Sequence, residues 1–342
     1  MFYLVNGRAW VRVGAMLLVD DPAQSDPRLN LALEEHLLRN VELNEPILLF
    51  YQNAPSVIIG RNQNTLEEID PEYVQREGLQ LVRRLSGGGA VYHDLGNLNF
   101  SFVTPSKEGL HDFARFTGPV VQALRELGVP AELRGKSDIF AAGKKVSGNA
   151  QYASGGRMFS HGTLLFNTDL EAMLKALNPR QVAIESRAVQ SVRNYVANLC
   201  ELLPAGMSLA ELKAALLAGL FGRGEPPRYA LGPADREQVE AIAAGRYRRW
   251  EWNIGHSPRF NVRKSAQTPA GKVDARIEVE NGRVAGIRFY GDFEGRRDVA
   301  ELEERLIGVR YEAGALGQAL ADLDPRPYFG ELPAGQLRDL LY

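Results

Sequence analysis

Apolar side chains recur at helical spacing near the start of the chain. Four aliphatic residues follow one another at intervals of four positions: Leu29, Leu33, Leu37 and Val41. This spacing places them on one face of a helix. Asp26 and Pro27 come directly before the stripe, and these residue types favour the cap and the first turn of a helix. The pattern predicts an amphipathic helix that begins at Asp26-Pro27 and packs its stripe against a core.

Short apolar segments rich in strand-forming residues come next. They span residues 47–51, 56–59 and 80–83, and we expect each to form a strand. Residues 97–103 instead alternate strictly between apolar and polar side chains. The apolar set is Leu98, Phe100 and Phe102, and the polar set is Asn97, Asn99 and Ser101. This alternation predicts a half-buried strand whose polar face lines a site.

Three more helices are predicted before residue 180. One begins at Asp70-Pro71 and ends at Gly78. A second carries an apolar stripe from Phe113 to Leu127 and stops at Gly128, and a third spans residues 167–177 before Asn178-Pro179.

The composition and the pattern of predicted elements change towards residue 250. Residues 222–236 are rich in glycine and proline, which indicates a loose connection, and a short helix over 234–244 follows. Beyond Trp250 the segments 273–280 and 283–290 are predicted strands, joined by the strong hairpin signal Asn281-Gly282.

The length of the chain and this change in composition and predicted elements together predict two domains. A chain of 342 residues has room for both, and the pattern divides it at 1–249 and 250–342. Two helices over 299–306 and 313–323 complete a small α+β unit at the C-terminal end. The larger part mixes strands and helices and is predicted to be α/β.

Composition narrows the class of protein. The chain is 45% hydrophobic and 24% charged, as expected of a soluble globular protein, and its formal net charge of −2 provides no general basic field for nucleic acid. Cys200 is the only cysteine, which excludes a disulfide within the chain and a thiolate metal cluster. Residues 1–15 lack a clean apolar core of signal-peptide length, and no apolar segment approaches the length of a membrane span, so we expect neither a signal peptide nor a membrane helix. We therefore expect a cytoplasmic protein that binds neither nucleic acid nor membrane.

The densest polar stretch lies at residues 83–98. It contains Arg83, Arg84, Ser86, the glycine triplet 87–89, His93-Asp94 and Gly96-Asn97. Glycines let a backbone approach a ligand closely, and exposed backbone N–H groups bind anions. Arginine adds a planar donor group suited to phosphate or carboxylate. A lone glycine triplet is more often a hairpin loop, but its polar flanks favour a nucleotide or acyl-phosphate site.

Several common sites are excluded by spacing. Gly135-Lys136-Ser137 lacks the first glycine of a Walker A loop because that position is Pro130, and Tyr92 occupies the third glycine position of a dinucleotide fingerprint. The five histidines include no zinc-binding spacing, and Ser86 does not lie in the Gly-x-Ser-x-Gly pattern of a serine hydrolase.

A second polar cluster spans residues 136–162. It contains Asp138, the lysine pair Lys144-Lys145 between Gly143 and Gly148, and His161. Flanking glycines allow a lysine to project from a tight hairpin into a cavity, where its ammonium neutralises phosphate oxygens. A Lys-Lys pair is most often solvated on both side chains, and alternation alone does not say which of the two faces a cavity.

These motifs together resemble a lipoate–protein ligase of the biotin/lipoyl attachment superfamily. The resemblance rests on Arg83-Arg84-x-Ser86-Gly87-Gly88-Gly89-x-Val91-x-His93-Asp94-x-Gly96-Asn97, on Gly143-x-Lys145-x-Ser147-Gly148, on His161-Gly162-Thr163 and on the upstream Gly60–Asn64. It covers nearly the whole chain after about residue 15. It implies an α/β (α+β) catalytic fold with mixed β-sheets flanked by helices, and a small accessory α+β domain at 250–342.

The resemblance also implies a reaction and its residues. ATP, with Mg²⁺, would convert lipoate to a bound lipoyl-adenylate, which then reacts with a lysine of a lipoyl domain. Lys145 and Asp138 match the catalytic positions, with Mg²⁺ near Asp138. Five residues besides Lys145 match the nucleotide site or pocket backbone: Arg84, Gly89, Ala90, Val91 and Tyr92. Lys145 and four further residues match the lipoate or adenylate pocket: Ser86, Gly87, His93 and His161. Strand faces around Leu98 and Val91 are expected to supply part of an apolar slot.

The implied partners are lipoate or octanoate and the apo lipoyl domains of 2-oxoacid dehydrogenase acyltransferase subunits and of the glycine cleavage carrier protein. A monomer is expected. The alternatives are an octanoyl or lipoyl transferase of the same fold, a biotin ligase, and a non-catalytic adaptor that binds lipoyl domains. A thioester-forming transferase needs a cysteine at the site, and Cys200 lies far from both motifs in the sequence.

Overall fold

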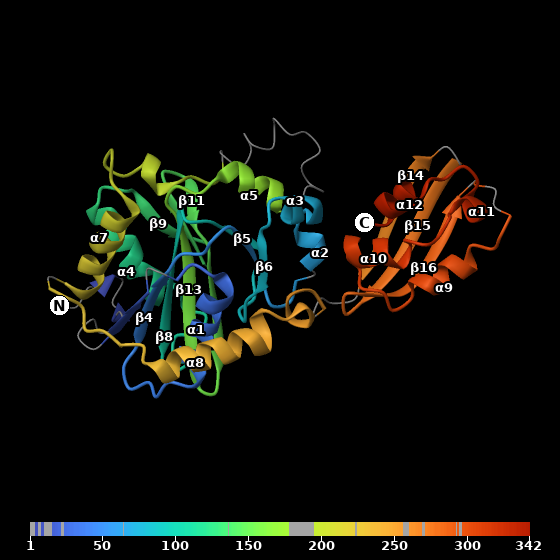
Figure 1. The fold of residues 1–342 in the computed structure, drawn as a ribbon. Helices are drawn as coiled ribbons and strands as arrows, with labels where there is room; N and C mark the ends of the chain where they lie inside the picture. The colour runs from blue at the N-terminus through green and yellow to red at the C-terminus, as the bar shows by residue number, and fades with distance from the viewer. Residues whose placement is uncertain are drawn as a thin grey trace. The chain divides into compact units, whose positions relative to one another are not determined.

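The chain folds into two compact units, Met1–Arg249 and Trp250–Tyr342, and each has its own sheets and helices (Figure 1). The computed structural model describes residues 4–5, 8–9, 16–21, 24–63, 65–135, 137–177, 195–222, 224–255, 260–268, 271–291, 293 and 296–342. The mixture of strands and helices confirms the predicted α/β class. Among these residues, no helix has the length and apolar character needed to cross a bilayer.

A five-stranded sheet forms the centre of the first unit. Its order is β12 (Asn149–Ser154), β13 (Arg157–Leu165), β8 (Asn97–Thr104), β4 (Ile47–Tyr51) and β3 (Leu17–Asp20). Only the β3–β4 pair is parallel. One face is apolar and packs against α4 (Phe113–Glu126) and α7 (Leu209–Phe221). That face holds the main hydrophobic core of the unit.

The opposite face of this sheet carries the polar side chains of β8 and is also buried. Every residue of β8 is buried, so the prediction of a half-buried strand is wrong. Helix α1 (Pro27–Arg39) packs against β8, and two of the polar side chains of this strand, Asn97 and Asn99, form hydrogen bonds in the interior. Asn97 donates to Asn99 Oδ1 at 3.0 Å, and Asn99 donates to the Tyr51 carbonyl at 3.3 Å. Such bonds allow polar side chains to remain in an interior.

Two smaller sheets complete the first unit. In one, β5 (Ser56–Ile59) lies between β6 (Gln80–Arg83) and β7 (Val91–His93). In the other, β10 (Asp138–Ala141) lies between β9 (Ala131–Arg134) and β11 (Lys144–Ser147). The glycine triplet therefore connects β6 to β7, and the lysine pair opens β11. β4, β5 and β6 have the predicted bounds.

Capping residues define several helices as predicted. Asp26 accepts from Arg28 N at the start of α1, and Asp70 accepts from Tyr73 N at the start of α3 (Pro71–Arg76). Gly128 follows α4 with a φ of 85°, a conformation that favours glycine. Helix α5 (Leu170–Ala176) begins three residues later than predicted because Asp169 caps it, and Asn178-Pro179 lie outside the described residues. The short helix α2 spans Thr65–Glu68.

The segment before the second unit is helical. Helix α8 (Pro233–Ile242) continues into a π-helical turn at Ala243–Tyr247, which confirms a helix in this region. Both pack against α1. Glu35 of α1 pairs with Arg246 at 3.0 Å, and His36 contacts Asp235 of α8 at 2.9 Å.

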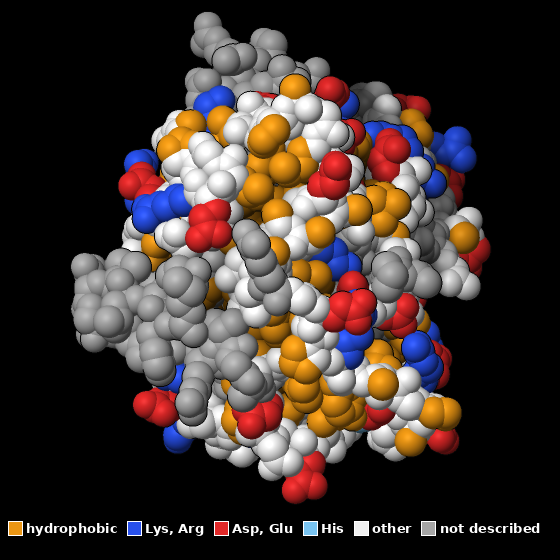
Figure 2. Space-filling view, turned by 90° about the vertical axis from the view of Figure 1, so that its left-hand side faces the viewer, with side chains coloured by type: hydrophobic (Ala, Val, Ile, Leu, Met, Phe, Trp, Pro, Cys, Tyr) orange, Lys and Arg blue, Asp and Glu red, His pale blue; other side chains and the backbone are white. Residues whose placement is uncertain are grey.

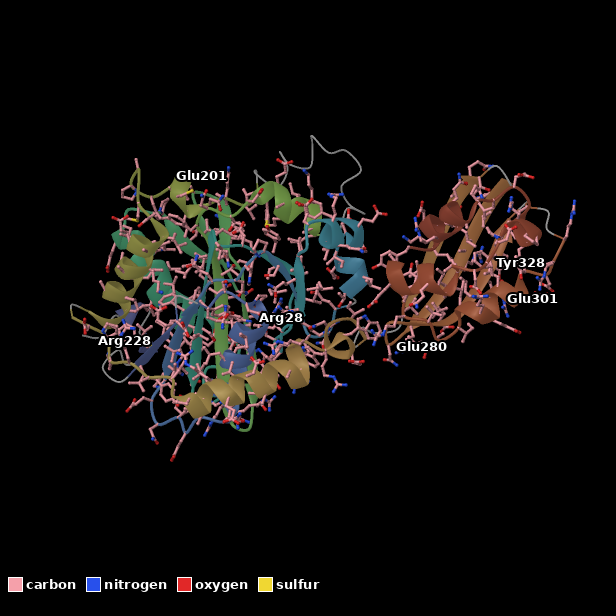
Figure 3. All side chains as sticks on the ribbon, viewed as in Figure 1. Arg28, Glu201, Arg228, Glu280, Glu301 and Tyr328 are labelled. Atoms are coloured by element: carbon pink, nitrogen blue, oxygen red, sulfur yellow. The ribbon has the colours of Figure 1, made fainter. Side chains whose placement is uncertain are left out.

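The second unit is a three-stranded antiparallel sheet with helices. Its strands are β14 (Phe260–Thr268), β15 (Gly271–Glu280) and β16 (Arg283–Gly291), and its α-helices are α9 (Ala300–Leu306), α10 (Ala313–Ala319), α11 (Arg326–Phe329) and α12 (Ala334–Leu341). The hairpin at Asn281-Gly282 is confirmed, with φ values of 51° and 73°. β14, α11 and α12 were not predicted. Tyr328 on α11 donates to Glu301 on α9 at 3.2 Å (Figure 3).

Replacing Gly282 with alanine is expected to destabilise the second unit by about 1–3 kcal/mol. Gly282 has a φ of 73°, and a Cβ there would lie 2.8 Å from the Trp250 ring and 3.1 Å from Gly255 Cα. Calorimetric unfolding of the whole chain measures the effect. Gly335→Ala in helix α12 is the matched control, because a Cβ there meets nothing within 4 Å. Equal melting profiles for the two variants would contradict the prediction.

Candidate active site

A pocket lies on the polar side of the five-stranded sheet. Its volume is about 220 Å³, and it is bordered by α1, the two smaller sheets, the glycine triplet and strands β12 and β13. The floor includes one row of neighbouring strand residues: Tyr51 opposite Asn99, and Asn99 opposite Thr163. Apolar walls come from Leu31, Ile58 and Val91. The pocket thus combines a polar floor with an apolar wall, as small-molecule sites often do.

Lys145 and Asp138 form an ion pair at the edge of this pocket. Lys145 Nζ lies 2.8 Å from Asp138 Oδ2, and each side chain is about a quarter exposed, at 28% and 26%. The β10–β11 hairpin turns through Ala142 and Gly143, whose φ values of 49° and 79° are left-handed. Lys145 lines the pocket, whereas Lys144 does not. A partly exposed ammonium in this position can bind an anionic ligand.

Two glycines leave space for neighbouring side chains, Gly148 beside this pair and Gly162 beneath Asn149. A Cβ at Gly148 would lie 3.4 Å from Lys145 Nζ. A Cβ at Gly162 would lie 1.9 Å from Asn149 Oδ1, so only glycine allows this amide to cover β13. Asn149 in turn donates to the Ser137 carbonyl at 2.6 Å. These contacts connect the edge of the large sheet to the residue directly before Asp138.

Arg84 gives the glycine triplet its shape. The side chain is 6% exposed, and its guanidinium donates to Ser86 Oγ at 3.0 Å and to the carbonyls of Ile58, Gly87 and Gly89 at 3.1, 2.6 and 2.8 Å. Burial lowers the pKa of Arg84 to about 10, so it stays charged at neutral pH. These four bonds occupy most of its five N–H donors. Arg84 borders the pocket chiefly by holding the loop around it.

Arg83 organises a second loop. It is fully buried and donates to the carbonyls of Gly60, Arg61 and Gln63 at 2.9, 3.0 and 2.7 Å, and to Thr65 Oγ1 at 2.6 Å. A Cβ at Gly60 would lie 1.9 Å from the Gly88 carbonyl oxygen. The loop at residues 60–63 therefore packs directly against the glycine triplet. Asn64, at its end, lies outside the described residues.

His161 connects helix α1 to the glycine loop. Its Nδ1 lies 2.9 Å from Glu34 Oε1, and its Nε2 lies 2.7 Å from Ser86 Oγ. A carboxylate only accepts, so Nδ1 donates to Glu34 and Nε2 accepts from the Ser86 hydroxyl. Ser86 is fully buried, and its oxygen accepts from Arg84. This arrangement gives Ser86 a structural bond in place of access to a substrate.

Most of the predicted site residues surround the pocket. The lining set contains Arg84, Gly89, Ala90, Val91, His93, Asp138, Lys145 and His161. Ser86, Gly87 and Tyr92 do not line it. Tyr92 alternates to the other face of β7 and packs with Val57 and Ile59.

The expected apolar slot is only partly correct. Val91 lines the pocket, but Leu98 points to the opposite face of the large sheet and belongs to the main core. Leu31, Tyr51 and Ile58 line the pocket instead. Glu34, Asn53 and Asn149 support the site and were not predicted. Long-range contacts define all three, and no local motif marks them.

Cys200 lies outside this pocket. It occupies a short 3₁₀ turn, Leu199–Glu201, and burial raises the pKa of its thiol. No cysteine lines the pocket, so the described site lacks the nucleophile that a thioester-forming transferase needs. Among the described side chains on the face shown in Figure 2, basic and acidic groups are interspersed.

Comparison with protein families gives two consecutive matches. Residues 26–221 match the lipoyl protein ligase A/B catalytic domain, and residues 257–341 match the bacterial lipoate protein ligase C-terminus. The chain is 45% identical to lipoate-protein ligase LplJ of Bacillus subtilis over 331 residues, covering 96% of this chain and all of that protein. It is 42% identical to lipoate–protein ligase 1 of Staphylococcus aureus over 318 residues, covering 93% and 97% of the two chains.

Solved structures give the same grouping. A bipartite lipoate protein ligase from Thermoplasma acidophilum, described with its E2 lipoyl domain, matches with a TM-score of 0.64 and 31% identity. That match covers 73% of this chain and 99% of the other. A crystal structure of lipoate-protein ligase A bound with ATP matches with a TM-score of 0.60 and 33% identity, covering 71% and 99%.

Proposed function

The chain belongs to the lipoate–protein ligase family, and from this premise we propose that its pocket activates lipoate with ATP and passes the lipoyl group to a lysine of an acceptor protein. One observation carries the proposal: the Lys145–Asp138 pair and the arginine-held glycine triplet border the same pocket, which also has an apolar wall. Relatives named lipoate–protein ligase match more than nine-tenths of the chain. One related structure holds ATP, and another holds lipoic acid.

The first step joins two anions. A carboxylate oxygen of lipoate attacks the α-phosphorus of ATP, pyrophosphate leaves, and a lipoyl-adenylate remains bound. Like charges oppose this approach, so the site must supply positive charge and fixed positions. Lys145 supplies a charge that can contact both the carboxylate and the α-phosphate. The backbone of Gly89, Ala90 and Val91 would border the nucleotide, within the loop shape set by Arg84.

The second step moves the acyl group to nitrogen. The ε-amine of the acceptor lysine attacks the acyl carbonyl, an amide bond forms, AMP leaves and the amine loses a proton. Asp138 is the one carboxylate among the described residues that line the pocket, and its place beside Lys145 suits it to orient an incoming ammonium group. The pocket histidines and the apolar wall would hold the acyl chain.

Magnesium fits this site only together with ATP. Mg²⁺ prefers oxygen ligands and commonly combines one or two carboxylates with substrate phosphates. Asp138 offers such an oxygen, and the described residues contain no cluster of three or more metal-binding side chains. Asp138 would therefore hold the ion with the phosphates of ATP. The ion would neutralise phosphate charge.

We propose that the acceptors are apo lipoyl domains, the kind of partner described with the Thermoplasma acidophilum ligase. Within that class we expect 2-oxoacid dehydrogenase acyltransferase subunits and the glycine cleavage carrier protein. The second unit would act as the accessory domain. A monomeric state and a cytoplasmic location stay predictions from the sequence.

Exchange of labelled pyrophosphate into ATP, which should require an added carboxylic acid substrate, tests the first step. Lipoate, octanoate and biotin are supplied separately, and transfer to a purified apo lipoyl domain is followed by its mass. We expect exchange with lipoate, then addition of one lipoyl group per acceptor lysine. The absence of exchange with every acid would contradict the adenylation step, and would favour a transferase or an adaptor. Exchange with biotin alone would favour a biotin ligase.

A further inference from the structure

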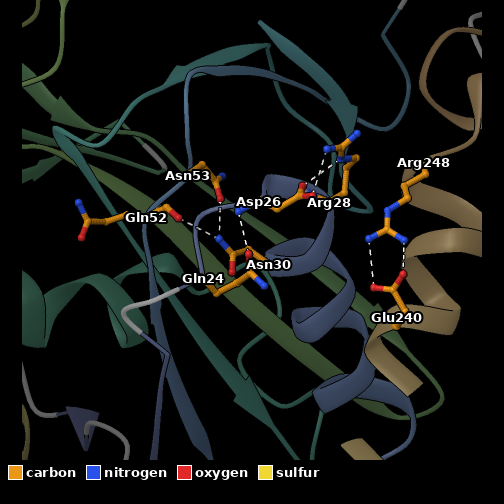
Figure 4. A network of polar contacts seen from close by, with 8 residues as sticks. All are labelled: Gln24, Asp26, Arg28, Asn30, Gln52, Asn53, Glu240 and Arg248. Atoms are coloured by element: carbon orange, nitrogen blue, oxygen red, sulfur yellow. Dashed lines mark hydrogen bonds and ion pairs between the residues drawn. The ribbon is translucent and has the colours of Figure 1, made fainter. Parts of the chain in front are cut away.

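Asn53 connects helix α1 to a histidine of the pocket. Asn30 on α1 directs its amide nitrogen at the Gln52 carbonyl, 2.9 Å away, and at Asn53 Oδ1, 2.8 Å away (Figure 4). A backbone carbonyl only accepts, so the atom of Asn30 that faces it must be the NH₂ group. The Asn53 atom that accepts from the same group is therefore its oxygen. Both asparagines are buried, with exposed fractions of 1% and 0%.

This orientation determines where the proton of His93 sits. The remaining amide atom of Asn53, Nδ2, lies 2.9 Å from His93 Nδ1. An amide nitrogen only donates, so His93 Nδ1 must be the unprotonated acceptor and the ring proton must lie on Nε2. Nε2 is buried and has no hydrogen-bond partner within the described part of the chain. His93 also lines the pocket.

The ring stays neutral in this position. Burial, reinforced by the positive charge of the nearby Arg84, lowers the pKa of His93 to about 3. A buried N–H donor without a partner is costly, typically about 1–3 kcal/mol. Such a donor in a pocket is understandable when a ligand supplies the acceptor.

We propose that Asn53, held by Asn30, is a positioning residue that keeps His93 as the Nε2–H tautomer, so that the pocket offers a neutral hydrogen-bond donor to an acceptor atom of the bound acyl ligand. The choice of lipoate as that ligand rests on the proposed function. Lys145 supplies the charge for the anionic groups, and His93 supplies a donor without adding charge beside the apolar wall.

The substitution Asn53→Asp reverses the direction of the hydrogen bond between residue 53 and His93 Nδ1, and it changes the shape of the side chain little. The new carboxylate still accepts from Asn30, but it cannot donate to His93 and draws the ring proton to Nδ1. At pH 8, Nε2 then presents a lone pair to the pocket. We expect lipoate affinity, measured by calorimetry without ATP, to fall about 10- to 100-fold. ¹⁵N–¹H correlation spectra of histidine-labelled protein should show the proton on Nε2 in the wild type and on Nδ1 in the variant.

Two further variants distinguish an effect of the His93 tautomer from a general structural effect of the substitution. His93→Gln removes the imidazole, so adding Asn53→Asp to it should change lipoate affinity by less than about threefold. Asn198→Asp places a carboxylate at another buried asparagine, which bonds to Thr168 and does not line the pocket; its lipoate affinity should stay within about threefold of wild type. In the wild type alone, added lipoate should shift the His93 Nε2–H signal and slow its exchange with water.

A wild-type proton on Nδ1 would overturn the proposal, as would a tautomer change in Asn53→Asp that leaves affinity unaltered. If the wild type binds no lipoate, the proposed function and the ligand assigned here both fail, while the spectra still report the tautomer. If Asn53→Asp does not fold, the wild-type spectra with and without lipoate still decide the matter.

Discussion

Replacing Lys145 with alanine is expected to lower lipoate-dependent pyrophosphate exchange by at least about 10²- to 10³-fold. Lys145 is the lysine that lines the pocket, and its ammonium lies 2.8 Å from Asp138. Without it, the carboxylate of lipoate and the α-phosphate of ATP lose the positive charge with which Lys145 offsets their repulsion. The loss should appear mainly in kcat, because the charge matters most as the new bond forms.

Lys144→Ala is the matched control for this prediction. Lys144 is the adjacent residue on the same strand and does not line the pocket. We expect its exchange rate to stay within about threefold of wild type, because a solvated charge outside the site contributes little. Full exchange in Lys145→Ala would overturn the role given to Lys145. Equal losses in both variants would point to damage of the hairpin.

Arg83→Leu is expected to have the largest effect on stability, a loss of about 3 kcal/mol or more in the free energy of unfolding of the first unit. Arg83 is fully buried and donates to three carbonyls of the 60–63 loop and to the Thr65 hydroxyl. Leucine fills part of the space but cannot donate any of these four hydrogen bonds. Urea denaturation of the whole chain, followed by circular dichroism, measures the loss.

Arg76→Leu provides the comparison for Arg83. The side chain of Arg76 is 64% exposed and pairs with the neighbouring Glu77, so its loss should cost less than about 1 kcal/mol. Hydrogen exchange should speed up at residues 60–65 in Arg83→Leu and remain normal there in Arg76→Leu. An unchanged free energy of unfolding of the first unit in Arg83→Leu would show that water replaces these bonds at no cost.

Local chemistry made much of the fold predictable. Asp26-Pro27 and Asp70-Pro71 start helices because the cap and the first turn need only neighbouring residues. Asn281-Gly282 forms a hairpin because both positions need positive φ. The glycine triplet and the lysine pair could be identified as candidate site motifs for the same reason, because the residues of each motif are contiguous in the sequence.

The burial of individual side chains, and the face to which each one points, were less predictable because both depend on residues far away in the sequence. The alternation in β8 predicts a half-buried strand, but α1 packs against it and every residue of the strand is buried. Leu98 and Val91 are both apolar, yet only Val91 faces the pocket. Glu34 reads as an ordinary helix carboxylate until β13 brings His161 to it. The sheet order that decides these contacts has no local sequence pattern.

Helix α1 has consecutive buried glutamates that face different neighbours. Glu34 bonds to His161 beside the pocket, whereas Glu35 pairs with Arg246 in the turn that follows α8. The helix is therefore clamped on two sides, and a shift that widened the pocket would also break contacts to the connecting segment. On the proposed function, we therefore expect a longer or bulkier acyl chain to be accommodated by exchange of single side chains such as Leu31. On the proposed function, we expect the position of the α1 backbone to limit the size of the acyl chain that fits.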